Sequence, residues 1–432
     1  MYSQEVLNGG LKLFCQRQFQ EIRLGGWRVF VRKVRSLLQR LWFLAGIIAT
    51  APLVLLIVAI RPFVLVRFGT MRSERIGHFA ADAEAYLCAL DREKPDRRII
   101  DIICCLEPVC NRHLRAMWAR IIRITPGASL WGILDRGCQI MTRGDSHHIQ
   151  LSGRSKDYRL FPVSEPHLSF TYEEHQRGLE LLEQLGIPSG ASWVCIHNRD
   201  SAYLDKALDG RWSYHDYRDF SALTMISAAE ELNNRGYYVV RMGSVVAERL
   251  ISNNTMVIDY ASSALRSDFA DIYLLANCSA YLGSDSGVYS VALIFRKPIV
   301  LINFSATLIS GVLIRQGCYA FPFITKRLWH KEKQRFLGIR EMFEAGLAGA
   351  SESNRFEEAG VEPVCNTPEE IRDLAIEFDE RTKGSWQPQT GDEELQQRFW
   401  TIFRAHAPAE SQCGIQPRIG AAFLRNHLYL LE

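Results

Sequence analysis

Short apolar segments alternate with helical patterns along most of the chain. The segments read as buried strands, and between them apolar positions recur at the spacing of an amphipathic helix. Strands that alternate with helices form βα units and a parallel sheet, so the pattern predicts an α/β protein. The predicted strands are 63–69, 99–105, 121–124, 193–197, 237–242, 256–258, 280–283 and the run after Pro298, and the predicted helices include 111–119, 172–185, 219–234 and 268–276, with another from Ala128.

The βα alternation occurs twice, once on each side of residues 172–190. A length of 432 residues also fits two domains better than one. We therefore expect two doubly wound domains, 61–175 and 176–390, that face a cleft, with C-terminal helices at 391–432 packing back on the first domain. Open sheets of this kind bind ligands at the carboxyl ends of their strands.

The N-terminal segment 1–60 has a pattern of its own. Residues 41–60 carry no charge and are long enough to span the hydrocarbon of a membrane. Because basic residues stay on the cytoplasmic side and occur both before residue 41 and from Arg61 onward, both ends of the segment are expected on that side. Pro52 favours a kink, so we predict a kinked hairpin or an interfacial helix. A single-span anchor is the alternative.

The composition of the chain narrows the classes of protein to which it could belong. Charged residues make up 23% and the net charge is +3, which favours a globular protein and gives no indication of a nucleic-acid partner. The 11 cysteines form no CxxC pair, which predicts buried thiols in a reducing compartment. His147, His148 and His167 lie in the polar stretch 143–171 without metal-ligand spacing, and we expect them in loops.

Three polar clusters follow predicted strands. They are His197–Asp200, Arg241–Ser244 and Ser284–Gly287. Arginine forks suit phosphate oxygens, and small residues at a helix start expose backbone amides to an anion. Together they predict a diphosphate site. The plainer alternative is that Ser284 or Ser286 only caps a helix and that Arg199 pairs with Asp200.

The sequence does not match the common motifs that bind phosphate or carry a nucleophilic serine. The stretch Gly283–Gly287 places Asp285 where a G-x-S-x-G elbow has its serine, which argues against a serine hydrolase. The chain contains neither a P-loop nor a G-x-G-x-x-G motif.

The run 267–304 resembles the donor-binding half of GT-B glycosyltransferases. It is similar to the heptosyltransferase pattern of a helix, a strand, a D-S-G turn, a helix and a Pro-led strand. The segment IHNRD is similar to the H-x-R segment of fucosyltransferases. With RIGHF, HNRDSAYL, GYYVVRMGS, NTPEEI and FLRNH, the set resembles a family of bacterial glycosyltransferases found among surface-polysaccharide genes.

This resemblance implies a GT-B-like α/β fold with two Rossmann-like domains and a membrane-associated N-terminal segment. It implies transfer from a nucleotide-sugar donor to a membrane-associated glycan or lipid-linked acceptor at the cytoplasmic face of the inner membrane, without a cofactor or a metal. The implied base is His78, with Asp82 as the second candidate. The implied donor-binding residues are His197, Arg199, Arg241, Ser244, Ser284, Asp285, Ser286 and Gly287, with the segment Asp259–Ser263 as an alternative to Ser244 near the nucleoside.

Two further functions fit the same features in part. A sugar-nucleotide epimerase of this fold also uses a D-S-G turn, but it needs no membrane segment. A membrane-anchored glycan-binding or scaffold protein needs no nucleotide. Glu369 and Glu377 have the spacing of the glutamate pair in retaining enzymes, but they lie on a late helix without a glycine-rich loop before it, so we interpret the spacing as coincidence.

Overall fold

The computed structural model describes residues 2–92, 98–144, 146–151, 158–200, 213–315, 322–407 and 417–432. Contacts between residues divide the chain into two compact units. Unit 1 comprises Met1–Thr70, Pro95–Cys104 and Thr125–Ile149, and unit 2 comprises Met71–Lys94, Cys105–Ile124 and Gln150–Glu432. These units do not follow the expected boundaries at 60, 175 and 390, because parts of the predicted first domain group with each unit.

Unit 1 joins the N-terminal helix to a small sheet. Helix α1 (Tyr2–Ala59) bends at Gly26, whose φ of +61° is outside the helical range. The strands β1 (Val64–Met71), β2 (Arg98–Cys105) and β3 (His148–Ile149) follow in the order β2-β1-β3, and β1 pairs with β3 in parallel. Helix α4 (Ala128–Thr142) packs on α1. This described three-stranded sheet is smaller than the doubly wound domain we predicted.

Two local predictions in this region are wrong. Residues 121–124 are not a strand, because the amides of Ile121 and Ile122 bond to the Trp118 carbonyl and complete the last turn of α3 (Arg112–Ala119). The second wrong prediction concerns residues 143–171, which we expected to form loops: this stretch contains the short strand β3. Its neighbour His147 is fully buried and its Nδ1 lies 2.7 Å from the Val66 carbonyl.

Unit 2 contains a six-stranded parallel sheet. Its strands are β4 (Trp193–His197), β5 (Tyr238–Arg241), β6 (Val257–Ile258), β7 (Ala280–Gly283), β8 (Ile299–Phe304) and β9 (Phe323–Thr325). Their order, β6-β5-β4-β7-β8-β9, is that of a Rossmann sheet, with the reversal between β4 and β7. The predicted parallel α/β architecture is confirmed for this half of the chain.

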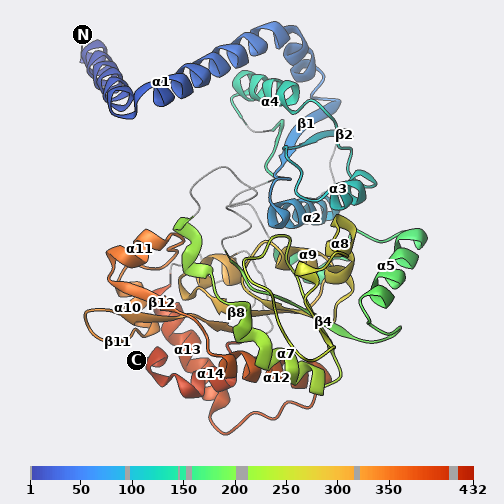
Figure 1. Ribbon diagram of the computed structural model, residues 1–432. Helices are drawn as coiled ribbons and strands as arrows, with labels where there is room; N and C mark the ends of the chain where they lie inside the picture. The colour runs from blue at the N-terminus through green and yellow to red at the C-terminus, as the bar shows by residue number, and fades with distance from the viewer. Residues whose placement is uncertain are drawn as a thin grey trace. The chain divides into compact units, whose positions relative to one another are not determined.

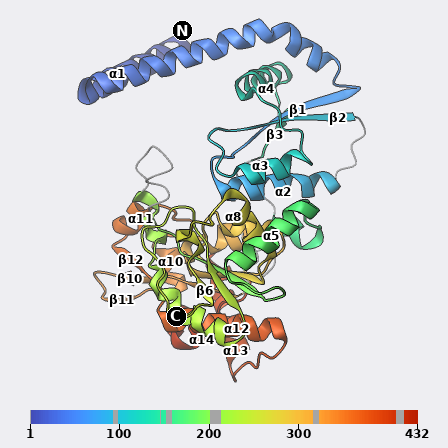
Figure 2. The same cartoon turned by 45° about the vertical axis from the view of Figure 1, so that its right-hand side comes forward.

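Helices cover both faces of this sheet. Helices α7 (Ile226–Asn234) and α12 (Pro368–Lys383) contact each other on one face, and α8 (Asp268–Asn277) and α9 (Tyr289–Ile294) contact each other on the other (Figures 1 and 2). The predicted cap of α12 is present: Thr367 Oγ1 accepts from the Glu370 amide, and Glu370 accepts from the Thr367 amide. Helix α2 (Ile76–Arg92) packs against α9, while α3 and α5 (Tyr172–Gln184) pack against α8.

The last part of the chain completes unit 2. Helices α13 (Asp392–His406) and α14 (Ala421–Asn426) pack against α10 (Ile339–Glu344) and α12, whereas we expected them on the N-terminal domain. The apolar face of α13, with Phe399 and Phe403, is buried there. The remaining elements are β10 (Arg327–His330), β11 (Arg335–Phe336), β12 (Val361–Val364), α11 (Ser353–Glu358), the π-helix Ile309–Arg315 and the 3-10 helices Tyr158–Val163, Ser213–Arg218, Ala222–Met225, Tyr260–Ser262, Ala306–Leu308 and Leu428–Leu431.

Candidate functional site

A cavity of about 580 Å³ lies where the strand order of the large sheet reverses. Residues that follow β4, β5 and β7 line it, together with the start of α2, the segment before α3 and one side of α8. All of its lining residues belong to unit 2. The position is the one at which open parallel sheets bind ligands, at the carboxyl ends of strands beside a reversal.

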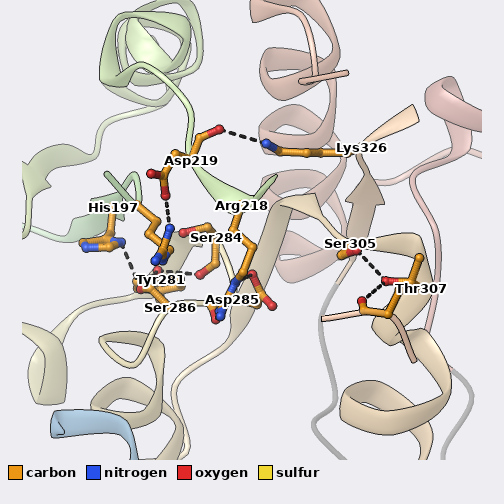
Figure 3. A network of polar contacts seen from close by, with 12 residues as sticks. His197, Arg218, Asp219, Tyr281, Ser284, Asp285, Ser286, Ser305, Thr307 and Lys326 are labelled. Carbon is orange, nitrogen blue, oxygen red and sulfur yellow. Dashed lines mark hydrogen bonds and ion pairs between the residues drawn. The ribbon is translucent and has the colours of Figure 1, made fainter. Parts of the chain in front are cut away.

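Two neutral side chains, those of His197 and Ser286, line part of this cavity. His197 ends β4, and its Nδ1 lies 3.0 Å from the Ser286 hydroxyl, which follows β7 (Figure 3). Burial, and then the charges of Arg241 and Arg199, lower the pKa of His197 to about 3. The ring is therefore neutral at physiological pH and can act as a hydrogen-bond donor or acceptor rather than as a cation. The Tyr281 hydroxyl supports the turn from below by donating to the Ser284 carbonyl.

Two arginines contribute positive charge. Arg199 pairs with Asp219. Arg218 pairs with Asp285 at 3.2 Å and donates to the Asp285 carbonyl. Burial, and then the nearby Arg218, lower the pKa of Arg199 to about 10. The two guanidinium groups therefore repel each other, and an anion between or beside them would be favoured.

Two predicted donor residues do not reach the cavity. Arg241 is fully buried and donates to the Glu248 carbonyl, the Asn198 side chain and Asp259. The reason is register: Arg241 pairs with Ile196, one residue before the end of β4, so it lies inside the sheet. Ser284 is also fully buried, because its amide still bonds to the His197 carbonyl and continues the ladder. Asp285, Ser286 and Gly287 lie beyond the ladder and do line the cavity.

The cavity also needs two glycines. Gly77, at the start of α2, lies against Gly287, at the turn before α9. A Cβ on Gly77 would be 2.8 Å from the Gly287 Cα, and a Cβ on Gly287 would be 3.0 Å from the Gly77 amide nitrogen. Only glycine permits this backbone approach, which brings the start of α2 to the turn that contains Gly287.

His78 and Asp82 face each other on α2. The His78 Nδ1 lies 3.1 Å from Asp82 Oδ2, and the His78 Nε2 lies 3.5 Å from an Arg72 nitrogen. His78 lines the cavity with a quarter of its side chain exposed, whereas the side chain of Asp82 is 2% exposed. Asp82 is thus placed to orient the imidazole, and of the two only His78 is placed to meet a substrate.

Apolar side chains also line the cavity. They are Met242, Val246, Ile272 and Leu275, and the predicted residue Ser244 lines the cavity as well. The segment Asp259–Ser263, which we considered as an alternative to Ser244, does not reach the cavity, since Asp259 is bonded to Arg241 and the Leu250 amide.

Asp271 is a carboxyl group that lines the cavity and was not among the residues predicted from the sequence. Its Oδ1 accepts from the Tyr260 hydroxyl at 2.8 Å and its Oδ2 from Arg266 at 2.8 Å. Burial raises the pKa of Asp271 to about 6, although both hydrogen bonds lower it. A shifted carboxyl group in a cavity is a candidate functional residue. Arg218 was missed as well, because it does not follow a predicted strand. Residues 201–212, which include part of the motif HNRDSAYL, lie outside the described residues.

A second polar cluster lies beside α2. Glu84, Cys88 and His167 bring potential metal ligands together among the residues that the structure describes. Arg296 already occupies this cluster, with a nitrogen 2.6 Å from Glu84 Oε1 and further bonds to the carbonyls of Ser164 and Glu165. The arginine neutralises Glu84, so we treat the cluster as an ion-pair network and assign it no metal.

The glutamates with eight-residue spacing have structural partners. Glu377 is 1% exposed, and it accepts from the Ala421 amide and from Arg381. Burial raises the pKa of Glu377, with those two partners opposing the shift. Glu377 ties α12 to α14, and neither it nor Glu369 lines the cavity.

Comparisons with known proteins show a distant similarity. No family model matches the chain, and no curated protein matches it. Among solved structures, ADP-heptose lipopolysaccharide heptosyltransferase II of E. coli matches 55% of this chain and 84% of its own, with 14% identity and a TM-score of 0.31. A family 9 glycosyltransferase of Veillonella parvula matches 55% of this chain and 80% of its own, with 10% identity and a TM-score of 0.33.

A dodecameric iron-containing heptosyltransferase, solved with ADP-D-β-D-heptose, matches 56% of this chain and 60% of its own, with 12% identity and a TM-score of 0.29. The chain is thus distantly similar to heptosyltransferase structures. Because the identities and TM-scores are low, the function proposed below is argued from the site alone.

Proposed function

We propose that the protein is a glycosyltransferase that moves a sugar from a nucleotide-sugar donor to a glycan or lipid-linked acceptor at the cytoplasmic face of a membrane. The observation that carries the proposal is the cavity at the strand reversal, which is lined both by charged side chains, among them Arg199 and Arg218, and by apolar ones such as Ile272. A nucleoside diphosphate likewise combines a charged part with a flat, mostly apolar part.

The diphosphate is expected beside Arg199 and Arg218. Arg199 and Arg218 can each present a planar fork to phosphate oxygens, which would also relieve their mutual repulsion. The neutral His197 and the Ser286 hydroxyl can add hydrogen bonds, and Gly287 lets the backbone approach. These groups would also stabilise the diphosphate as it leaves, which makes a metal ion unnecessary in this proposal.

The proton is expected to pass to His78. If Asp82 accepts from the protonated Nδ1, then Nε2 carries the lone pair, and an acceptor hydroxyl would replace the Arg72 nitrogen that lies 3.5 Å from it. His78 would take the proton of the acceptor hydroxyl while the bond between the sugar and the diphosphate breaks. Asp82 is a positioning residue in this scheme.

A binding screen tests the donor site. Uridine, guanosine and cytidine nucleotides and their sugars are titrated into the full chain, with binding measured by calorimetry and by thermal shift. We expect one nucleotide class to bind, and Arg199→Ala to weaken it by about tenfold or more, since a charged hydrogen bond contributes about 1.5–3 kcal/mol. Arg335→Ala is the matched control, because it also removes an arginine paired with a carboxylate but lies outside the cavity. Binding of no nucleotide, or equal binding by Arg199→Ala, would overturn the proposal.

A turnover assay tests the chemistry. His78→Gln should retain donor binding and lose at least about a hundredfold in transfer rate, in line with the usual contribution of a general base. Asp82→Asn should reduce the rate less and shift its pH profile. Product analysis separates the alternatives, because an epimerase converts the donor sugar without an acceptor, and a scaffold consumes no donor.

A further inference from the structure

We propose that helix α1 lies in the plane of an anionic membrane, held there by α4, and does not cross the bilayer. The segment Val29–Ala59 is the one helix of the described residues that is long and apolar enough to span a membrane. The inference rests on unit 1 and is independent of the sugar transfer proposed for unit 2.

One face of α1 is part of the folded core of unit 1. Val54 and Ile57 are 2% and 7% exposed and share a cluster with Val66 and Phe68 of β1. Two glycines set the crossing of the helices. A Cβ on Gly46 would be 2.6 Å from the Ile133 side chain of α4, and a Cβ on Gly137 of α4 would be 2.8 Å from Val54. Figures 1 and 2 both show α4 beside this part of α1.

The opposite face is apolar and open. Leu44, Ile48 and Leu55 are 55%, 68% and 53% exposed. On α4, Ile140 and Met141 add to the exposed apolar surface of the pair. Helices α1 and α4 therefore each have one face packed against the protein and a second, exposed apolar face, which is typical of a surface that binds a partner.

This packing conflicts with a spanning helix. To cross the bilayer, residues 46–57 of α1 would either leave the core cluster and expose Phe68 and Leu134 or carry α4 with them into the hydrocarbon. Helix α4 carries Arg136 and Asp135, and Asp135 is bonded to His148 of β3 at 2.8 Å. Charged groups are strongly disfavoured at the bilayer centre. A helix half embedded at the interface keeps both the core and these charges in place.

The charge of α1 identifies the partner as lipid. Basic residues outnumber acidic ones strongly in its N-terminal half, where Glu21 is the one acidic residue between Arg17 and Arg40; the basic residues there are Arg17, Arg23, Arg28, Arg32, Lys33, Arg35 and Arg40. A basic stretch followed by an apolar one matches a surface of anionic headgroups above acyl chains. A protein partner or a second copy of this chain would have to supply the same acidic and apolar pattern.

Topology and binding are tested together on the full chain. An N-terminal epitope tag and a C-terminal tag are probed by protease in sealed inverted membrane vesicles, and we expect both to be cleaved. In parallel, purified protein is mixed with liposomes of phosphatidylcholine alone or with about one third phosphatidylglycerol, and sedimentation measures the bound fraction.

Matched substitutions identify the face that binds. Ile48→Glu and Leu55→Glu should each reduce the partition into anionic liposomes by about tenfold, because each removes the transfer of a large aliphatic side chain. Leu428→Glu is the control, since Leu428 has nearly the same exposure, 55%, but lies in unit 2. Protection of only the N-terminal tag would overturn the proposal in favour of a single span. Failure to bind liposomes, or Leu55-dependent self-association in their absence, would overturn it in favour of a protein interface.

Discussion

Asp271 gives the sharpest quantitative prediction. In the unfolded chain an aspartate has a pKa near 3.8, and in the folded protein burial raises the pKa of Asp271 to about 6. A carboxyl group whose pKa is higher in the folded state destabilises the protein once it is ionised. Stability is therefore lost as the pH rises from about 4 to about 6, and the full loss persists above that range. A pKa difference of about two corresponds to about 3 kcal/mol.

Asp271→Asn should remove this dependence. The asparagine oxygen still accepts from Tyr260, but the bond from Arg266 is lost at every pH, which costs about 1 kcal/mol. The variant should thus be about 1 kcal/mol less stable than the wild type at pH 4 and about 2 kcal/mol more stable at pH 8. Urea unfolding at a series of pH values measures both differences.

Tyr260→Phe provides the complementary test. The Tyr260 hydroxyl lowers the pKa of Asp271, so its removal should make the loss of stability between pH 4 and 6 larger. The double variant Tyr260→Phe/Asp271→Asn should lack that loss. If Asp271→Asn shows the same change in stability between pH 4 and 8 as the wild type, the reasoning about Asp271 is refuted. If it gains stability but loses nucleotide binding, the buried carboxyl group is retained for ligand binding at a cost in stability.

Three glycines give further predictions. Gly77→Ala places a Cβ 2.8 Å from the Gly287 Cα, so we expect about tenfold weaker donor binding by calorimetry as the turn is displaced. Gly178→Ala places a Cβ against the ring of Tyr273, and overpacking should lower the free energy of unfolding by about 1–3 kcal/mol or more in urea titrations. Gly132→Ala meets no atom within 4 Å on α4 and should instead gain about 0.5–1 kcal/mol, which makes it the control for both.

The strands and the positions of the polar clusters could be predicted from the sequence. Apolar runs such as Trp193–His197 and Ala280–Gly283 are strands in the structure, and the residues that follow them lie at one edge of the sheet. This succeeds because a buried parallel strand needs a continuous apolar run, which few other elements require. The predictions failed for short or exposed elements: Ile121 and Ile122 belong to the end of a helix, and β3 has only two residues.

The partners of the polar residues could not be predicted. Arg199 pairs with Asp219, 20 positions away, and Arg218 pairs with Asp285, 67 positions away, across loops without a local pattern. The position of Asp271 at the cavity could not be predicted either. It lies in a helix with a strong apolar pattern, and only the fold turns that part of α8 toward the cavity.

Arg241 was predicted to bind the donor but does not line the cavity, and the reason shows what limits such predictions. A polar residue near the end of an apolar run lies either in the last pair of the ladder or beyond it, and one residue of register decides between the two. His197 pairs with Gly283 at the last row and meets Ser286 beyond it, whereas Arg241 pairs with Ile196 one row earlier and is buried. Its guanidinium then fixes the loops after β4 and β5 through Asn198 and the Glu248 carbonyl. Arg241 therefore holds these loops in place and is not among the residues that line the cavity. Its removal should disturb the folding of unit 2 and donor binding together, while removal of Arg199 should affect donor binding alone.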